Sequence, residues 1–208
     1  IISNFYDPSE TLFRDTPHSK QHHPGINALA WTEGLFPEND RSEAREKIAF
    51  LPFETSVILT FDYLSFLFEN GYRQRAFDLI ADPKERWGKM VSSGSRTIWE
   101  GFEDIESHTH AWNCYPLSLL QRYVLGIEPA VPGFQKIKIA PFFPAQLQKI
   151  EGAVQTPFGA LTLTGSFSEQ AVQFIIEVPQ NIVAEFQYKE LRKELSSGLH
   201  TFTIASNS

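Results

Sequence analysis

The hydrophobic pattern of the chain changes at about Gly126, and the two sides of that residue predict different secondary structure. Before Gly126, apolar residues recur at intervals of three and four, as they do along one face of an α-helix. The clearest helix is expected from about Thr55 to Asn70. Its apolar face would be formed by residues at i, i+4, i+7 and i+11, which are Val57, Phe61, Leu64 and Phe68.

The ends of this helix carry the residues that usually bound helices. Thr55 or Ser56 can cap the start, and Gly71 suits the left-handed position just past the end. Shorter helical patterns follow the same logic, with proline or glycine near their ends. They are expected at Gly25–Trp31, Ser42–Ala49, Arg73–Ala81, about Glu85–Val91, and from Pro116 to Gly126.

After about Gly133 the period of the pattern becomes two, which is typical of strands. Val172, Phe174, Ile176 and Val178 alternate with polar residues and would share one face of a sheet. The pairs Ile137/Ile139 and Leu161/Leu163 show the same alternation. Turn residues separate these runs at Thr156–Gly159, Pro179–Asn181 and Ser196–Gly198.

Together these patterns predict an α + β protein in two domains. Residues 1–126 would form a helical domain built from antiparallel hairpins. Residues 127–133, which lie between Gly126 and Phe134 and contain two prolines, would form a linker. Residues 134–208 would form an antiparallel β-sandwich, because short strands with regular turns favour that architecture.

Composition and charge narrow the classes of partner. The net charge of −7 disfavours nucleic acid and anionic membranes, because phosphates would be repelled. No apolar run is long enough to cross a bilayer. A single cysteine, Cys114, excludes an internal disulfide and leaves the cellular compartment open. The first residues show no natural start, which suggests that the chain comes from a longer polypeptide.

The stretch from Thr97 to Trp112 holds most of the candidate chemistry. It contains four carboxylates, two histidines and two tryptophans. A tryptophan face beside a carboxylate suits a sugar, whose C–H face stacks on the ring while its hydroxyl groups need charged acceptors. A solvated acidic loop with two core tryptophans explains the composition equally well, so both interpretations stay open.

Other candidate motifs are weaker. His18, His22 and His23 could hold a metal, but no acidic ligands stand at a clear spacing, so solvated loop histidines are favoured. Ser95 lies in a sequence that lacks the second glycine of a nucleophile elbow. The sequence therefore predicts neither a metal nor a cofactor.

Several segments, in the same order along nearly the whole chain, resemble bacterial α-L-rhamnosidases, the inverting glycosidases that release terminal L-rhamnose. The central one is Arg96-Thr-Ile-Trp-Glu100, which is similar to the family's Thr-Thr-x-Trp-Glu motif. The others are Leu12–Asp15, His23–Ala28, Glu85–Met90, Ser107–His110, Tyr123–Pro129, Pro132–Phe134 and Ser197–Phe202.

The resemblance implies a fold and a site. The fold would be the end of an (α/α)6 toroid of six helical hairpins, followed by a small β-sandwich. Glu100 would be the general base that activates water, and Trp99 and His110 would line the rhamnose subsite. Trp112 is added as a substrate-binding candidate that the resemblance does not supply, and a core role fits it at least as well. The expected partner is a rhamnose-containing glycan or glycoside.

The general acid of the family lies upstream of this chain, and none of the carboxylates here matches it. Glu103, Asp104 and Glu106 are expected to be solvated loop charges or groups that support the site. The 208 residues alone are therefore expected to be inactive, and to be unstable or held by the missing N-terminal part or by another copy. Two alternative functions stay open. One is that of another six-hairpin glycosidase, and the other is that of a non-catalytic carbohydrate-binding or structural fragment.

Overall fold

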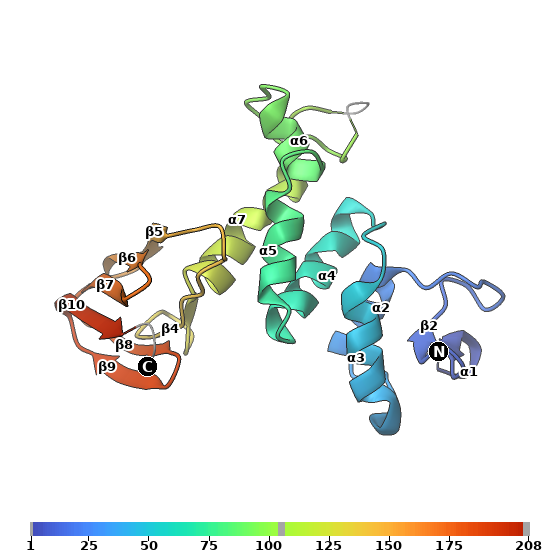
Figure 1. Ribbon diagram of the computed structural model, residues 1–208, viewed down its shortest axis with the longest axis horizontal. Coiled ribbons are helices and arrows are strands. Elements are labelled where there is room, and N and C mark those ends of the chain that lie inside the picture. The colour runs from blue at the N-terminus through green and yellow to red at the C-terminus, as the bar shows by residue number, and fades with distance from the viewer. Residues whose placement is uncertain (1, 104–106, 206–208) are drawn as a thin grey trace. The chain divides into compact units, whose positions relative to one another are not determined.

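The computed structural model describes residues 2–103 and 107–205, which form two compact units (Figure 1). The first unit, Ile1–Pro116, is mainly helical, and the second, Leu117–Ser208, is mainly β-structure. The predicted α + β class is therefore confirmed. No helix in the described ranges is long and apolar enough to cross a membrane.

The helical unit contains six α-helices, two short 3₁₀ helices and a two-stranded sheet among its described residues. The α-helices are α1 (Ile2–Phe5), α2 (Pro24–Thr32), α3 (Arg41–Phe50), α4 (Val57–Glu69), α5 (Arg73–Ala81) and α6 (Arg86–Ser92). The remaining elements are β1 (Tyr6–Asp7), β2 (Leu12–Phe13), η1 (Glu38–Asp40) and η2 (Ala111–Cys114). The helices expected from the sequence are all present, with ends within about two residues of the predicted ones.

Helices α2 and α4 run side by side in the same direction. Near their starts, a Cβ atom added to Gly25 would lie 2.4 Å from the Cβ atom of Leu59, so only glycine allows this approach. Near their ends, the rings of Trp31 and Phe66 meet edge to face, with centroids 5.5 Å apart. The first residues of both helices therefore lie at the same end of the unit.

Helix α4 is bounded as expected, with Ser56 at its N-cap and Gly71 at φ = 96° just past its end. Of its predicted apolar face, Val57, Leu64 and Phe68 are buried, but Phe61 is 39% exposed. The helix buries a broader face than predicted, because four further residues are also covered. These are Thr60, Tyr63, Phe66 and Leu67.

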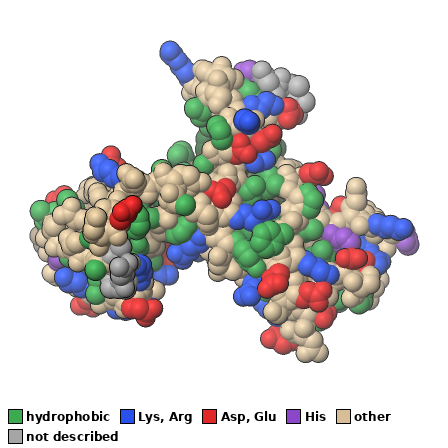
Figure 2. Space-filling view, in the orientation of Figure 1, with side chains coloured by type: hydrophobic (Ala, Val, Ile, Leu, Met, Phe, Trp, Pro, Cys, Tyr) green, Lys and Arg blue, Asp and Glu red, His purple; other side chains and the backbone are tan. Residues whose placement is uncertain are grey.

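Some hydrophobic side chains of the helical unit reach its surface among charged ones, as Figure 2 shows. On α4 these are Ile58 and Phe61, and Leu29 and Phe50 are exposed on α2 and α3. Phe61 is therefore the one residue of the predicted apolar face of α4 that is exposed.

The β unit opens with a helix that continues from the first unit. Helix α7 (Pro116–Leu119) passes into a π-helical turn, η3 (Leu120–Val124), and Leu117 at its start is exposed. Gly126 ends it at φ = 71°, and a Cβ atom there would lie 2.1 Å from the carbonyl oxygen of Ala140. Glycine is thus required by both the backbone angle and the close approach.

Two four-stranded sheets form the rest of this unit. The first has the order β10-β7-β6-β5 and is antiparallel throughout, and the second has the order β3-β4-β8-β9. The strands are β3 (Ile127–Pro129), β4 (Lys136–Ile139), β5 (Lys149–Thr156), β6 (Gly159–Phe167), β7 (Ala171–Val178), β8 (Val183–Tyr188), β9 (Leu191–Leu195) and β10 (Gly198–Ala205).

The prediction of a wholly antiparallel arrangement is wrong at one place. Strands β4 and β8 pair in parallel, with Ile137 opposite Ala184 and Ile139 opposite Phe186. Between them the chain builds β5, β6 and β7 of the other sheet. Because no hairpin joins β4 to β8, the local sequence does not set their relative direction.

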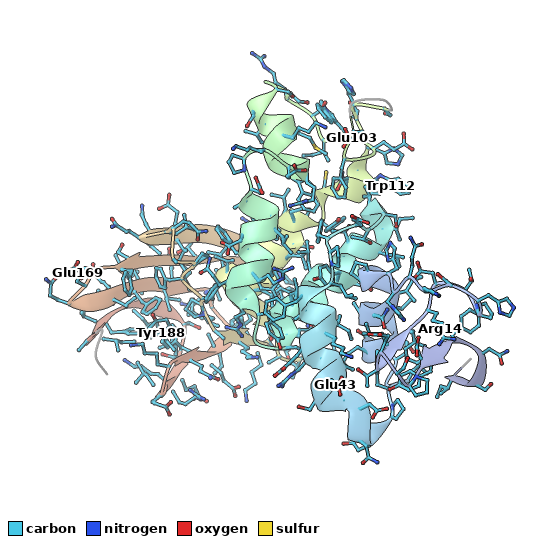
Figure 3. All side chains as sticks on the ribbon, turned by 45° about the vertical axis from the view of Figure 1, so that its right-hand side comes forward. Arg14, Glu43, Glu103, Trp112, Glu169 and Tyr188 are labelled. Carbon is cyan, nitrogen blue, oxygen red and sulfur yellow. The ribbon has the colours of Figure 1, made fainter. Side chains whose placement is uncertain are left out.

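The core of this unit follows the predicted alternation. Val172, Phe174, Ile176 and Val178 of β7 are all at most 2% exposed. The ring of Phe174 lies 5.0 Å from that of Phe186 in the other sheet, so aromatic side chains join the two sheets. Tyr188 of β8, labelled in Figure 3, also contacts Phe174, at 5.1 Å.

We expect Phe174→Ala to lower the free energy of unfolding of the chain by about 3–5 kcal/mol, because it removes a fully buried ring. Its neighbour Ile175 points to the other face and is 40% exposed, so Ile175→Ala should cost about 1 kcal/mol or less. Urea denaturation of both variants measures the difference. Equal losses would contradict the assigned faces of β7.

Candidate active site

The segment from Ser95 to Cys114 follows α6 and includes η2, and two of its described parts lie side by side. The backbone N–H of Glu100 donates to the carbonyl of Ser107 at 2.8 Å, and that of His110 donates to the carbonyl of Ile98 at 2.9 Å. These two bonds hold residues 98–100 beside residues 107–110. The fold therefore brings Glu100 and His110 together. Asp104 and Glu106 lie outside the described residues.

Glu100, His110 and Trp112 form a partly exposed group. The Nδ1 atom of His110 lies 3.5 Å from Oε2 of Glu100, with side-chain exposures of 37% and 31%. The rings of His110 and Trp112 lie 4.6 Å apart at 34°. The indole N–H of Trp112 donates to the carbonyl oxygen of Glu100 at 2.7 Å, while 44% of the residue stays exposed. Trp112 is thus not a core residue in this structure.

Trp99 has a different environment from the other candidates. It is only 3% exposed, and its indole N–H donates to Oγ of Ser95 at 3.0 Å. Its ring stacks on that of His108, with centroids 5.2 Å apart. In this structure Trp99 lies beneath the surface of the segment, and a contact between its ring and a sugar stays a prediction.

Asn113 was not identified from the sequence, although it is fully buried next to this group. Its Oδ1 atom accepts a hydrogen bond from the indole of Trp87 at 2.9 Å. Its Nδ2 atom donates to the carbonyl oxygen of Trp99 at 3.1 Å. A single asparagine between Trp112 and Cys114 gives no pattern from which these contacts could be inferred.

Trp87 of α6 links the segment to the helices. Its ring meets those of Phe102 and Tyr115 edge to face, at 5.1 and 5.6 Å. The hydroxyl group of Tyr115 donates to the carbonyl of Val57, the first residue of α4, at 3.0 Å. Burial raises the pKa of the Tyr115 phenol, so it remains a neutral donor. The candidate site therefore lies at the end of the helical unit where α4 begins.

Glu103 behaves as a loop charge, as expected. Its side chain is 71% exposed and pairs with Lys89 of α6, with Oε2 and Nζ 2.6 Å apart. Figure 3 shows Glu103 and Trp112 at the same end of the helical unit, with Arg14 in another part of it. This pair adds a second attachment of the segment to α6, but exposed pairs contribute little to stability.

The prediction of solvated loop histidines is wrong for two of the three. The ring of His23 caps helix α2, because its Nδ1 atom accepts a hydrogen bond from the N–H of Gly25 at 3.1 Å. The side chain of His22 is only 13% exposed and lies 3.6 Å from Oδ2 of Asp7. Packing between the N-terminal segment and α2 covers both residues, which the sequence alone did not indicate.

Asp7 is a buried charge in that region. Hydrogen bonds from Ser9 and Arg14 hold the pKa of its carboxyl group well below the usual range. A cavity of about 660 Å³ opens beside it and is lined only by polar residues. Within residues 2–103 and 107–205, no group of three or more histidine, cysteine or acidic residues is placed to hold a metal.

Comparison with known proteins gives a family match for the β unit. Residues 126–202 match the family model of the bacterial α-L-rhamnosidase C-terminal domain. A curated α-L-rhamnosidase from Alteromonas sp. (strain LOR) is 24% identical over 176 residues, which is 76% of this chain and 19% of that protein. Another, from Formosa agariphila, is 25% identical over 113 residues, or 49% of this chain and 12% of that protein.

Solved structures extend the likeness to both units. The α-L-rhamnosidase from Dictyoglumus thermophilum has a TM-score of 0.82 at 19% identity, over 99% of this chain and 27% of that one. The Streptomyces avermitilis α-L-rhamnosidase, solved in complex with L-rhamnose, has a TM-score of 0.79 at 19% identity, over 87% and 21% of the two chains. At this identity the solved structures establish the fold alone.

The chain spans about a fifth or less of the length of the curated relatives it matches. The family model, the relatives and the fold all indicate the same region of the same family. Residues 126–202 thus match the bacterial α-L-rhamnosidase C-terminal domain family, and the chain as a whole is similar to the C-terminal portion of α-L-rhamnosidases.

Proposed function

We propose that this chain is part of an α-L-rhamnosidase that removes terminal L-rhamnose with inversion, and that Glu100 is its general base. The observation that carries the proposal is the pairing of a partly exposed carboxylate, Glu100, with His110 beside the exposed face of Trp112. It lies in the segment that resembles the family's catalytic motif.

Glu100 has the surroundings that a base needs. In an inverting glycosidase one carboxylate takes a proton from the attacking water while another carboxyl group, roughly 6.5–9.5 Å away, protonates the leaving oxygen. With 31% of its side chain exposed, Glu100 can reach such a water. The imidazole of His110, 3.5 Å from Oε2, restricts the directions in which the carboxylate can turn.

The sugar would lie against Trp112 and His110. Their rings are 4.6 Å apart and both are partly exposed, so they offer an apolar face next to a hydrogen-bonding nitrogen. A pyranose needs both kinds of contact. Trp99, at 3% exposure, would contribute to the rhamnose subsite mainly by holding the backbone of Glu100 in place.

We also propose that the helical unit is the end of an (α/α)6 toroid and that the two sheets form a β-sandwich. The side-by-side, same-direction packing of α2 and α4 supports the toroid, since inner helices of such a ring run in parallel. The proposed boundaries are residues 1–126, a linker at 127–133, and residues 134–208. The start of the family match at residue 126 supports this division.

The general acid would come from a part of the polypeptide outside these residues. Of the carboxylates considered, Asp15 accepts a hydrogen bond from the backbone of His23, and Glu103 pairs with Lys89. We therefore propose neither of them as the proton donor. The expected partners are a rhamnose-containing glycan or glycoside and the missing N-terminal part or a second copy, with no cofactor.

In the intact protein, Glu100→Gln should lower kcat for an aryl α-L-rhamnoside by about 10²–10⁴-fold, because general-base catalysis contributes that much. The fold should be kept, since the contacts of Glu100 with Ser107 and Trp112 are made by its backbone. Initial rates under saturating substrate measure the change.

Glu103→Gln is the matched control, because Glu103 lies in the same segment but is 71% exposed and paired with Lys89. It should leave kcat within about twofold of the wild-type value, in line with the small effect of surface pairs. Hydrolysis at the wild-type rate by Glu100→Gln would show that the base is another residue.

The 208 residues expressed alone should release no rhamnose, because the proposed proton donor lies outside them. The exposed Ile58 and Phe61 of α4 should also promote association. Gel filtration and an assay of rhamnoside hydrolysis test both expectations. A monomer that turns over substrate would require the general acid to be one of the carboxylates present.

A further inference from the structure

We propose that Asn113 is a positioning residue that sets the position of Glu100 through the carbonyl group of Trp99. This inference rests on the proposed role of Glu100 as the base. Asn113 itself is fully buried and has no access to substrate or water. Its effect on the reaction would therefore be exerted entirely through its hydrogen bonds.

The amide of Asn113 links Trp87 of α6 to the backbone of Trp99. On one side its Oδ1 atom and its backbone carbonyl accept from the indole N–H of Trp87, at 2.9 and 3.1 Å. On the other its Nδ2 atom donates to the carbonyl of Trp99 at 3.1 Å. The peptide group that contains this carbonyl also contains the N–H of Glu100, so the bond acts on the residue directly before the base.

The same peptide group is held from its other side. Its N–H, which belongs to Glu100, donates to the carbonyl of Ser107 at 2.8 Å. Opposed bonds at the oxygen and the nitrogen of one peptide fix both its position and its tilt. The Cα atom of Glu100 follows the peptide, and the carboxylate then meets His110 at 3.5 Å.

Because Asn113 is buried, its hydrogen bond to the carbonyl of Trp99 favours a single position of that carbonyl. A buried amide that loses a partner leaves an unsatisfied polar group, which destabilises any other geometry. The indole N–H of Trp87, on helix α6, donates to Oδ1 of Asn113. The rings of Phe102 and Tyr115 pack against Trp87 and hold it in place. The segment that carries Glu100 is therefore aligned by the helical scaffold as well as by its own backbone contacts.

The test is Asn113→Asp in the intact protein, because the change preserves size and the acceptor for Trp87. It replaces the Nδ2 donor with an oxygen that faces the carbonyl of Trp99. We expect kcat to fall by about 10–100-fold, since a shift of about 1 Å in a catalytic group can cost 10²-fold. KM should change by less than about threefold, because Asn113 touches no substrate.

Asn27→Asp is the matched control. Asn27 is also fully buried, its Oδ1 atom accepts from the N–H of Phe13 at 2.7 Å, and its Nδ2 atom donates to the carbonyls of Phe13 and His23. The same substitution there creates the same repulsion in the helical unit, away from the segment that carries Glu100. It should lower the thermal unfolding temperature by a similar amount while leaving kcat within about threefold of wild type, measured well below unfolding.

A pH profile gives a second reading. Burial raises the pKa of a carboxyl group, and a protonated Asp at position 113 could again donate to the carbonyl of Trp99. The ratio of kcat for Asn113→Asp to kcat for wild type should therefore rise as the pH is lowered. The ratio for Asn27→Asp should stay flat.

Hydrogen exchange separates this proposal from the proposed function. In Asn113→Asp the backbone amides of Glu100 and His110, which donate to Ser107 and Ile98, should exchange faster than in wild type or Asn27→Asp. This reading does not require activity, so it decides the positioning role even if Glu100→Gln proves active and the function assignment fails. If Asn113→Asp does not fold, Trp87→Phe removes the indole donor, keeps an aromatic ring, and should accelerate exchange at the same two amides.

Two results would overturn the proposal. The first is a loss of kcat in Asn113→Asp no larger than that in Asn27→Asp. The second is unchanged exchange at Glu100 and His110 in Asn113→Asp or, where that variant does not fold, in Trp87→Phe.

Discussion

The position of Glu100 depends on a buried hydrogen-bonded chain that runs from Trp87 through Asn113 to the carbonyl of Trp99. Polar groups without access to water must find partners inside the protein, and here Asn113 finds one on helix α6 and one in its own segment. Because Trp87 belongs to helix α6, these hydrogen bonds hold the segment that carries Glu100 in a fixed position against the helical unit. Tyr115 extends this support to the start of α4 through the carbonyl of Val57.

The sequence predicted most of the secondary structure because local patterns determine it. The apolar residues of the period-two pattern in β7 are at most 2% exposed. Ser56 and Gly71 bound α4 as expected. Where tertiary contacts decide, the prediction was incomplete. Helix α4 buries four side chains beyond the predicted face while Phe61 of that face is exposed. The direction of β8 relative to β4 could not be predicted, because no hairpin connects the two strands.

The candidate site shows the same division. The spacing of Glu100, His110 and Trp112 within one segment, together with the resemblance to the family motif, is enough to group them, and the segment folds so that they lie together. The sequence could not reveal that Trp99 is buried while Trp112 is exposed, since both are tryptophans in the same polar stretch. Nor could it reveal Asn113, whose role depends on Trp87, 26 residues away.

The central claim is that Glu100 activates a water molecule, and the stereochemistry of the product tests it most directly. Proton NMR of the intact protein with an aryl α-L-rhamnoside can identify the first sugar anomer released, before mutarotation mixes the anomers. A base acting on water requires attack from the opposite face, so β-L-rhamnose should appear first. Release of α-L-rhamnose first would mean that configuration is retained and would contradict a general-base role for Glu100.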